Sequence, residues 1–388
     1  MTQPRTLISG GVLEDGSAPH ILIDSDGRII GVSEREGDVS SDNLDHIDLD
    51  GRLIVPSLVE PHAHLDKSLT ADVVPNPKGD LMGAIHGWRD AEAAGVIGHE
   101  EMVGRIRRSL EMLLASGVTA VRSHINVGGP VSTRYLIAAI EAAATFRQRM
   151  DIEFVALTYM PMSGEGSDIN LAALNDAIEL GVEVIGGCPH LEPDSDSCVS
   201  KVFELAERHQ RKVDLHVDET LDPTALTIND VVRYSRGSGI LTTASHCVSL
   251  GMLPVEQVQP LAENIAAAEV SIVALPQTNL FLQGRDDPVA TPRGLTAIHA
   301  LVAAGVDLVA GADNAQDPFN FVGRNDPLET AALMVMAGHM LPSDAFATIS
   351  SNPRKALGMP EVSIEVGQPA DLLAVRAAST RQAIAEAP

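Results

Sequence analysis

The feature that most constrains the fold is a short apolar run followed by a helix-length segment, which recurs eight times from about residue 55 onwards. Continuous apolar runs that alternate with helical segments are typical of a parallel sheet covered by helices. Eight such units fit a closed (β/α)8 barrel, which usually takes about 250 residues, better than an open sheet. The runs are "LIVPSLVEPHAH", "VTAVRSHINV", "EFVALTYMP", "VEVIGGCPH", "KVDLHVDE", "GILTTASHC", "SIVALPQTN" and "DLVAGADN".

The two ends of the chain have a different pattern from the repeats. Before residue 55, short alternating strands are separated by turns that contain Asp-Gly or Gly-Gly, which predicts a small β-sheet. Near the other end, "EVGQPADLLAV" (365–375) predicts a strand that rejoins this sheet. We therefore predict an α/β protein with a TIM-type barrel at 55–358 and a small β-sandwich domain built from 1–54 and 359–388.

The charge balance limits the classes of partner. The chain has 53 Asp and Glu residues against 27 Lys and Arg residues, which gives a formal net charge of -26. Such a protein repels a phosphate backbone or an anionic membrane, so we expect a small-molecule substrate, no nucleic acid and no membrane. No apolar run approaches the roughly 18 residues of a membrane span, and the start of the chain lacks the pattern of a signal peptide. We expect a cytoplasmic protein.

Histidines gather at the ends of the predicted barrel strands. Active sites of such barrels form at the carboxyl ends of the strands. Six of the 13 histidines lie there, which scattered histidines would seldom do. In "VEPHAH" the two histidines are separated by one residue, so in a strand both side chains point to the same face. The six are His62, His64, His124, His190, His216 and His246.

A subset of these strand ends has the composition of a metal site. His62 and His64 from the first run, His216 from the fifth and Asp313 from the eighth supply three nitrogens and one oxygen. These ligands suit zinc or Fe(II) with one position left open for water, and the pKa of bound water falls from about 15.7 towards about 7. Glu219 lies three residues after His216, where a carboxylate can shuttle protons without binding the metal.

Other strand-end residues admit more than one interpretation. An isolated HxH sequence is also compatible with a polar loop. For His124 we favour a structural or supporting role, whereas His190 can either contact substrate or hydrogen-bond a neighbouring loop. Cys188 and Cys247 also lie at strand ends, where small buried thiols are the more common explanation.

Taken together, these motifs resemble the amidohydrolase superfamily and, within it, the cytosine deaminases. The resemblance covers nearly the whole chain, and the order and chemistry of its motifs make a chance match implausible. The fourth run lacks the lysine that bridges two metals in other branches of the superfamily, which favours the mononuclear, deaminase-like branch. The motifs are "VEPHAHLDK", "VRSHINV", "DLHVDE", "TASHC", "LQGRDD", "GADNAQDPF" and "GQPADLLAV".

The resemblance implies a site and a reaction. One divalent metal ion, zinc or Fe(II), would be held by His62, His64, His216 and Asp313, and hydroxide on this metal would be the nucleophile. Asp313 would help to take a proton from the water, His246 would orient or polarise it, and Glu219 would pass protons to a ring nitrogen and then to the leaving group. The implied reaction is hydrolytic deamination of an amino-substituted, cytosine-like N-heterocycle with release of ammonia. The resemblance is also compatible with a homo-oligomer.

The sequence departs from cytosine deaminase where the substrate would be recognised. Tyr159 and Met160 occupy a region where that enzyme has a glutamine, Asn314 replaces a second aspartate, and Lys67 replaces an uncharged residue. We therefore expect a heterocycle other than cytosine, with contacts from Lys67, Tyr159, Asn314 and His190. The alternatives are hydrolysis of another C–N bond, as in an N-alkylamino-triazine or a cyclic amide, and a non-catalytic binding protein.

Overall fold

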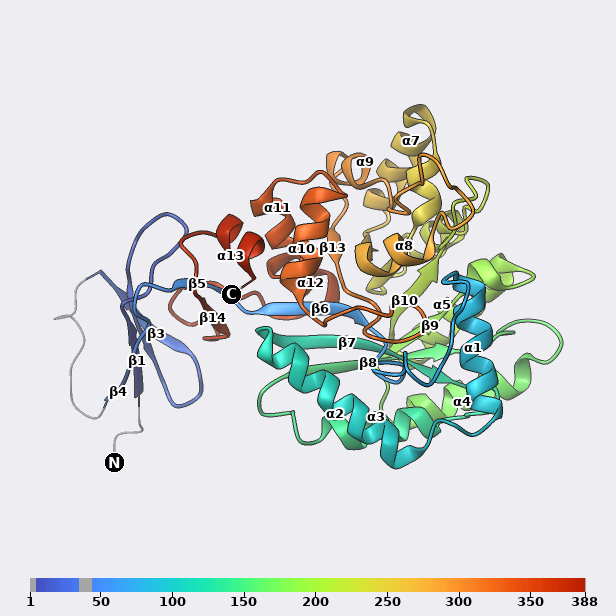
Figure 1. Ribbon diagram of the computed structural model, residues 1–388, viewed down its shortest axis with the longest axis horizontal. Helices are drawn as coiled ribbons and strands as arrows, with labels where there is room; N and C mark the ends of the chain where they lie inside the picture. The colour runs from blue at the N-terminus through green and yellow to red at the C-terminus, as the bar shows by residue number, and fades with distance from the viewer. Residues whose placement is uncertain (1–4, 35–43, 388) are drawn as a thin grey trace.

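The structure, a computed structural model, describes residues 5–34 and 44–387. Its largest element is a sheet of eight strands, hydrogen-bonded in the order in which they occur in the sequence and parallel throughout (Figure 1). The predicted (β/α)8 barrel is therefore confirmed. The strands are β6 (Leu58–Ala63), β7 (Val118–Val127), β8 (Asp151–Thr158), β9 (Val184–Gly187), β10 (Lys212–Val217), β11 (Thr242–His246), β12 (Val270–Ala274) and β13 (Leu308–Ala310).

The sheet closes between its first and last strands. The backbone nitrogen of Asp313 donates to the carbonyl of His62 at 2.9 Å, and the nitrogen of His64 donates to the carbonyl of Asp313 at 3.1 Å. These two bonds continue the parallel ladder just beyond the end of β13, where a bridge also joins Ala63 to Asp313. The closure therefore places the first and eighth strand ends side by side.

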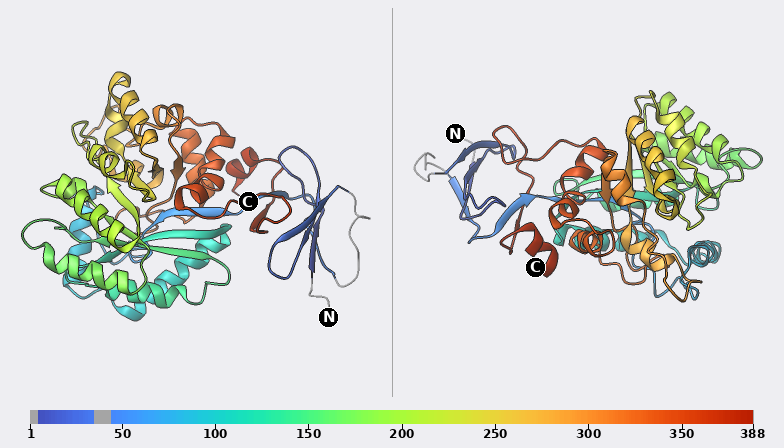
Figure 2. Two further views of the ribbon diagram at one scale, coloured as in Figure 1. Left: turned by 180° about the vertical axis from the view of Figure 1, so that it is seen from behind. Right: turned by 90° about the horizontal axis from the view of Figure 1, so that it is seen from above.

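Helices follow the strands and cover the outside of the barrel (Figure 2). The segments at 99–117 and 170–181, for example, lie largely in α2 (His99–Ala115) and α4 (Ser167–Glu179). Within the described residues, no helix is both long enough and apolar enough to cross a membrane. The helices are α1 (Leu81–Ala93), α2 (His99–Ala115), α3 (Arg134–Ala143), α4 (Ser167–Glu179), η2 (Pro189–Leu191), α5 (Ser195–His209), α6 (Ile228–Ser235), η3 (Val248–Met252), α7 (Val255–Ala267), α8 (Pro276–Leu282), α9 (Ile298–Ala303), α10 (Pro327–Met336), α11 (Pro342–Ala347), α12 (Ser351–Leu357) and α13 (Thr380–Glu386).

Small sheets from both chain ends lie beside the barrel (Figure 1). One has four strands in the order β3-β2-β1-β4, and the other pairs β5 with β14 in antiparallel orientation. The backbone nitrogen of Ile29 in β3 also donates to the carbonyl of Gln368 at 2.9 Å, so the returning chain contacts the four-stranded sheet just before β14. The predicted strand itself pairs with β5 and does not join that sheet. These strands are β1 (Arg5–Ser9), β2 (His20–Ile23), β3 (Ile29–Ser33), β4 (Leu44–Asp48), β5 (Leu53–Pro56) and β14 (Leu372–Val375).

The C-terminal segment is less extended than the sequence pattern indicated. The strand expected at 365–375 is confined to β14, and the chain continues into the helix α13. The side chain of Ser379 accepts a hydrogen bond from the backbone nitrogen of Gln382 and so caps this helix, while Ala383 and Ile384 are buried. A local cap and two buried apolar residues thus favour a helix in the predicted β-segment.

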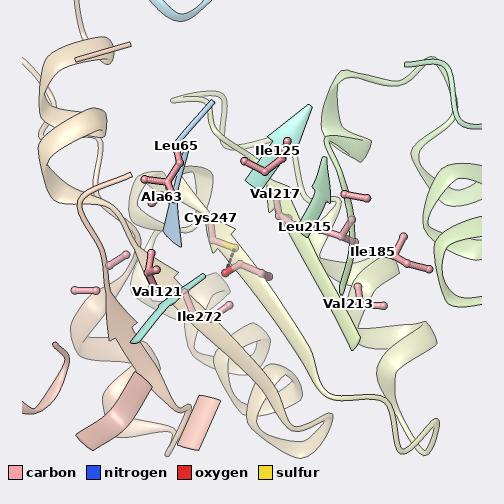
Figure 3. Close-up of a cluster of buried hydrophobic side chains, with 14 of the residues drawn as sticks. Ala63, Leu65, Val121, Ile125, Ile185, Val213, Leu215, Val217, Cys247 and Ile272 are labelled. Carbon is pink, nitrogen blue, oxygen red and sulfur yellow. Dashed lines mark hydrogen bonds between the residues drawn. The ribbon is translucent and has the colours of Figure 1, made fainter. Parts of the chain in front are cut away.

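Side chains of the barrel strands alternate between two environments. One set points outwards and packs in the core between strands and helices (Figure 3); it includes Ala63, Leu65, Val121, Ile125, Ile185, Val213, Leu215, Val217, Cys247 and Ile272. The residues between them are polar and equally buried, for example His62, Arg122 and Asp214. Because strand residues alternate between faces, this second set occupies the barrel interior. The barrel therefore has an aliphatic outer layer, and its interior is polar around these residues but apolar at Val273 and Val309.

Candidate metal centre

The four predicted metal ligands lie together in the barrel. The Nε2 atoms of His64 and His216 are 3.1 Å apart. The Oδ1 atom of Asp313 lies 3.1 Å from Nε2 of His64 and 3.5 Å from Nε2 of His62. One ligand atom from each of the four residues lies within 4.8 Å of the other three, and all four side chains are buried. The geometry is that of a single cation site.

The electrostatics of these residues fit a divalent cation. Burial lowers the pKa of His62, His64 and His216 well below the usual range, so each imidazole is neutral and has a lone pair. Burial also raises the pKa of Asp313 well above its ordinary value. Nε2 of His62 and Oδ1 of Asp313 are buried without a hydrogen-bond partner. A cation coordinated by three nitrogens and one oxygen would satisfy these atoms, and zinc and Fe(II) both accept such ligands.

The backbone is unusual at two of the strand ends. Asp313 has φ +68° and His246 has φ +70°, in the left-handed region that non-glycine residues seldom adopt. A residue in this conformation ends the strand, and its side chain no longer follows the alternation between the two faces of the strand. Such conformations cost about 1–3 kcal/mol each and persist where the surrounding structure determines them, which is common at functional sites.

Glu219 and His246 lie next to each other beside the four grouped side chains. Oε1 of Glu219 lies 3.6 Å from Nδ1 of His246, and Nε2 of His246 lies 3.9 Å from Oδ2 of Asp313. Burial raises the pKa of Glu219 to about 8 and lowers that of His246 to about 3. The Glu219 carboxyl can therefore gain and lose a proton near neutral pH, which is the property required of a proton shuttle.

Two residues that the sequence analysis did not assign hold this pair in place. Asp218 accepts hydrogen bonds from the backbone nitrogens of Thr227 and Ile228, each at 3.0 Å, and so anchors the loop that carries Glu219. Nδ2 of Asn279 lies 3.2 Å from Nδ1 of His246. Asn279 is the last residue of the seventh apolar run, but the structure places it in α8, after the end of β12, so the run was only an indirect signal.

A cavity of about 120 Å³ opens beside the ligands. Glu219, His246 and Asp313 line it, together with Lys67, Tyr159 and Asn314, three of the predicted substrate contacts. His190 is not among the residues that line the cavity, and its Nδ1 lies 3.0 Å from the carbonyl of His216. The structure thus brings the predicted catalytic residues and three of the four predicted contacts to one cavity.

Lys67 is buried and has several polar neighbours. Its Nζ lies 2.9 Å from Oδ1 of Asn126, 3.3 Å from Nδ1 of His64 and 3.4 Å from Oδ1 of Asp66. Oδ2 of Asp66 in turn accepts a hydrogen bond from the backbone nitrogen of Asn126 at 3.0 Å. The lysine is therefore held by an ion pair and an amide at the edge of the cavity.

One wall of the cavity comes from α1, which the sequence analysis had not connected with the site. Trp88 lines the cavity and donates from Nε1 to Oε1 of Glu92 at 2.7 Å, and the hydroxyl of Tyr159 also donates to Glu92. The only tryptophan of the chain lies in register with Leu81 and Ile85 on this helix, and both also line the cavity. The helical spacing of these three residues is the signal that could have identified the wall.

His124 is fully buried beneath the ligands. Its ring centroid lies 3.9 Å from that of His62, with an angle of 30° between the ring planes. Cys247 is also buried, and Cys188 lies at the cavity, where burial raises its pKa to about 12. All three cysteines are free thiols.

Comparison with known proteins identifies the family. The model of the amidohydrolase family matches residues 53–386, which include the entire barrel and its ligands. The chain belongs to the amidohydrolase family. Among curated relatives, this amidohydrolase is 31% identical over 333 residues to the pterin deaminase of Rhizobium rhizogenes, covering 84% of this chain and 75% of the relative.

Solved structures of similar proteins agree with this assignment. The 5-methylcytosine deaminase of Klebsiella pneumoniae liganded with 5-fluorocytosine superimposes with a TM-score of 0.88 at 28% identity, covering 99% of this chain and 94% of that one. The N-isopropylammelide isopropylaminohydrolase of Burkholderia multivorans gives a TM-score of 0.84 at 25% identity, covering 100% and 95%. These relatives are deaminases and amidohydrolases, so this amidohydrolase is a metal-dependent hydrolase of C–N bonds.

Proposed function

We propose that this amidohydrolase hydrolytically deaminates an amino-substituted N-heterocycle and releases ammonia. The observation that carries the proposal is the position of Glu219, a buried carboxyl with a pKa raised to about 8, in the same cavity as the four predicted ligands. Deamination of an amidine unit requires a group that delivers a proton to the ring nitrogen and then to the departing amine. A carboxyl that titrates near neutral pH can do both.

The chain's own residues account for the proton transfers. When bound, zinc or Fe(II) supplies Lewis-acid activation of water. Asp313 accepts a proton from the attacking water. Neutral His246 faces Asp313 through Nε2 at 3.9 Å and can donate a hydrogen bond that orients the nucleophile. Glu219 protonates the ring nitrogen, takes up the remaining hydroxyl proton of the tetrahedral adduct and passes it to the amine, which departs as ammonia. The proton held by Asp313 then restores the Glu219 acid.

The dimensions of the cavity support a particular mode of substrate binding. A volume of about 120 Å³ is close to that of an engineered cavity of about 150 Å³ that takes benzene. The ring that bears the amino group therefore lies inside, between Glu219 and the Trp88 wall. Any second ring, as in a pterin, extends along the face of α1 formed by Leu81 and Ile85. Lys67, Tyr159 and Asn314 contact the polar edge of the enclosed ring.

A second candidate reaction is cleavage of an N-alkylamino group from a triazine. Its support is the likeness over the full chain to the isopropylaminohydrolase of Burkholderia multivorans, together with apolar residues at the cavity that could contact an alkyl group, namely Leu157, Leu191 and Phe319. This reaction uses the same residues but releases an alkylamine. The leaving group therefore distinguishes the two candidates.

The test is a product screen with purified protein loaded with zinc or with Fe(II). Cytosine, 5-methylcytosine, pterin, a creatinine-like ring and N-isopropylammelide are supplied separately, and ammonia and isopropylamine are quantified. The proposal predicts ammonia from at least one aminated ring, released about 10²–10⁴-fold more slowly by a Glu219→Gln control of equal metal content. Release of isopropylamine alone would favour the second candidate, and no product from any compound would contradict both.

A further inference from the structure

A chain of hydrogen bonds connects one predicted metal ligand to the charged interior of the barrel. Nδ1 of His62 lies 2.9 Å from Oγ of Ser245, and this hydroxyl donates to Oδ1 of Asp214 at 3.2 Å. The other oxygen of Asp214 accepts from Nη1 of Arg122 at 2.9 Å. The four residues come from β6, β11, β10 and β7, and all are fully or almost fully buried.

The carboxylate of Asp214 determines which group donates and which accepts in each of these hydrogen bonds. A guanidinium only donates hydrogen bonds, so Oδ2 of Asp214 is an acceptor towards Arg122. Oδ1 of Asp214 is likewise an acceptor, because the hydroxyl of Ser245 donates to it at 3.2 Å. The hydroxyl oxygen then offers its lone pair to His62, whose Nδ1 must carry a proton. The remaining lone pair of His62 is on Nε2, the atom that lies 3.5 Å from Oδ1 of Asp313.

Arg122 is itself held by two partly buried charged residues. Its Nε donates to Oε2 of Glu153 at 2.7 Å, and Nζ of Lys212 donates to Oε1 of the same carboxylate at 2.6 Å. The charges of Arg122 and Lys212 therefore balance those of Glu153 and Asp214. We refer to these four residues as the charged layer. Because both carboxylate oxygens of Asp214 have partners, its orientation towards Ser245 is determined by more than one bond.

The same region could be mistaken for a second cation site. His62, His124 and Asp214 place one possible ligand atom each within 4.8 Å of one another, and both ring nitrogens of His124 lack a hydrogen-bond partner. However, the permanently charged guanidinium of Arg122 lies 2.9 Å from the same carboxylate and would repel a cation. His62 Nδ1 also faces the Ser245 hydroxyl, which leaves no free nitrogen on that side. The charged layer therefore supports the neighbouring site of the four predicted ligands and does not form a second cation site.

We propose that Ser245 and Asp214 are positioning residues that fix the tautomer and ring orientation of His62, so that Nε2 is presented to the cation. The proposal rests on the metal centre of the proposed function. Groups that hydrogen-bond the distal nitrogen of a metal-binding histidine orient the ring and raise its basicity, and their loss typically weakens metal affinity by about 10–100-fold. His124, stacked against His62 at 3.9 Å, limits the remaining rotation of the ring.

The experiment compares two substitutions in the same strand. Ser245→Ala removes the hydroxyl that contacts His62. Thr243→Val is the matched control, because it removes a fully buried hydroxyl that accepts from Arg122 at 3.2 Å and has no hydrogen bond to a histidine. Zinc affinity is measured by chelator competition, zinc stoichiometry by elemental analysis, and ligand geometry by the visible absorption spectrum of the Co(II)-substituted protein.

We expect Ser245→Ala to weaken zinc binding by about 10–100-fold and to change the Co(II) spectrum, with Thr243→Val close to wild type in both. Equal zinc affinity in Ser245→Ala and wild type, or equal losses in both variants, would overturn the proposal. The wild type should bind one zinc per chain. Two zinc ions per chain would mean that the charged layer binds a cation itself, which contradicts its supporting role. No zinc binding at all would contradict the metal centre.

A double-mutant cycle tests the role of Asp214 separately. If Asp214 acts through Ser245, Asp214→Asn weakens zinc binding in the wild-type background but adds little in the Ser245→Ala background. Additive losses would show that Asp214 does not act through Ser245. Because Asp214→Asn removes the partner of a buried guanidinium, the variant can fail to fold. In that case the comparison of Ser245→Ala with Thr243→Val decides alone.

Discussion

The backbone nitrogen of Asp313 donates to the carbonyl of His62 at 2.9 Å, so two predicted ligands of the metal also close the barrel. The aspartate follows the last strand and the histidine lies in the first, about 250 residues apart in the chain. Their side chains meet because the ladder that joins the two strands ends at these residues. Ligand geometry and barrel closure therefore depend on the same few backbone bonds.

Substitution of Asp313 by asparagine should weaken metal binding without opening the barrel. Asparagine retains the shape of the side chain and tolerates the φ of +68° found here better than alanine does. It removes the negative charge and so should reduce zinc affinity by at least the roughly 10–100-fold typical of a lost supporting contact. Elemental analysis after dialysis checks this, and circular dichroism reports the fold. Unchanged zinc stoichiometry would contradict a ligand role for Asp313.

Substitution of Glu219 by glutamine should separate catalysis from metal binding. Glu219 is not among the four grouped ligands, and it lies 3.6 Å from His246 in the cavity. Loss of a positioned general acid–base typically lowers turnover by about 10²–10⁴-fold. We expect this decrease in kcat, measured as ammonia release, with zinc content equal to that of wild type. Loss of zinc together with activity would indicate that Glu219 is itself a ligand.

The pH dependence of stability should also report Glu219. In the cation-free protein, burial raises its pKa from 4.5 to about 8. Between these values the native state retains a proton that the unfolded state releases, so this residue makes stability fall as the pH rises from about 4.5 to about 8. Glu219→Gln cannot ionise. The melting temperature of Glu219→Gln minus that of wild type should therefore increase across this window. The corresponding difference in the free energy of unfolding is on the order of a few kcal/mol, as set by the size of the pKa shift.

The control for this measurement is bound zinc. A nearby cation favours the ionised carboxylate, so zinc should reduce the difference between wild type and Glu219→Gln at pH 8. A difference in melting temperature that is constant from pH 4.5 to pH 8 would mean that Glu219 ionises normally in the folded protein.

Features encoded by local sequence pattern could be predicted from the sequence. The eight apolar runs identify the barrel because strands buried on both sides read as continuous apolar segments. His62 and His64 were recognised from their alternation, and His216 and Asp313 from their positions at strand ends. The general rule that the strand ends of such a barrel converge brings these residues together, and the resemblance to the amidohydrolase superfamily supports the choice of His216 among the six histidines at strand ends.

Features that depend on contacts between distant side chains could not be predicted in this way. Glu92 contacts both Trp88, four residues away, and Tyr159, 67 residues away, and only the second contact brings the helix to the cavity. The link from His62 to Ser245 spans 183 residues and has no local pattern at all. The position of His190 at a strand end likewise did not show whether its ring would face the cavity or the backbone. Its Nδ1 lies at the carbonyl of His216.

Substitution of Lys67 by methionine tests its predicted role in substrate binding. Methionine replaces the length of the buried stem and removes the ammonium, which lies 2.9 Å from Oδ1 of Asn126 at the cavity. If the ammonium contacts the polar edge of the ring, KM should rise by roughly 10-fold or more, since a hydrogen bond to a charged group contributes about 1.5–3 kcal/mol. Lys78→Met, at an exposed position, is the matched control and should leave KM unchanged. Steady-state kinetics with the substrate found in the product screen, at equal zinc content, measure both. An unchanged KM in Lys67→Met would restrict this lysine to pairing with Asp66 and Asn126.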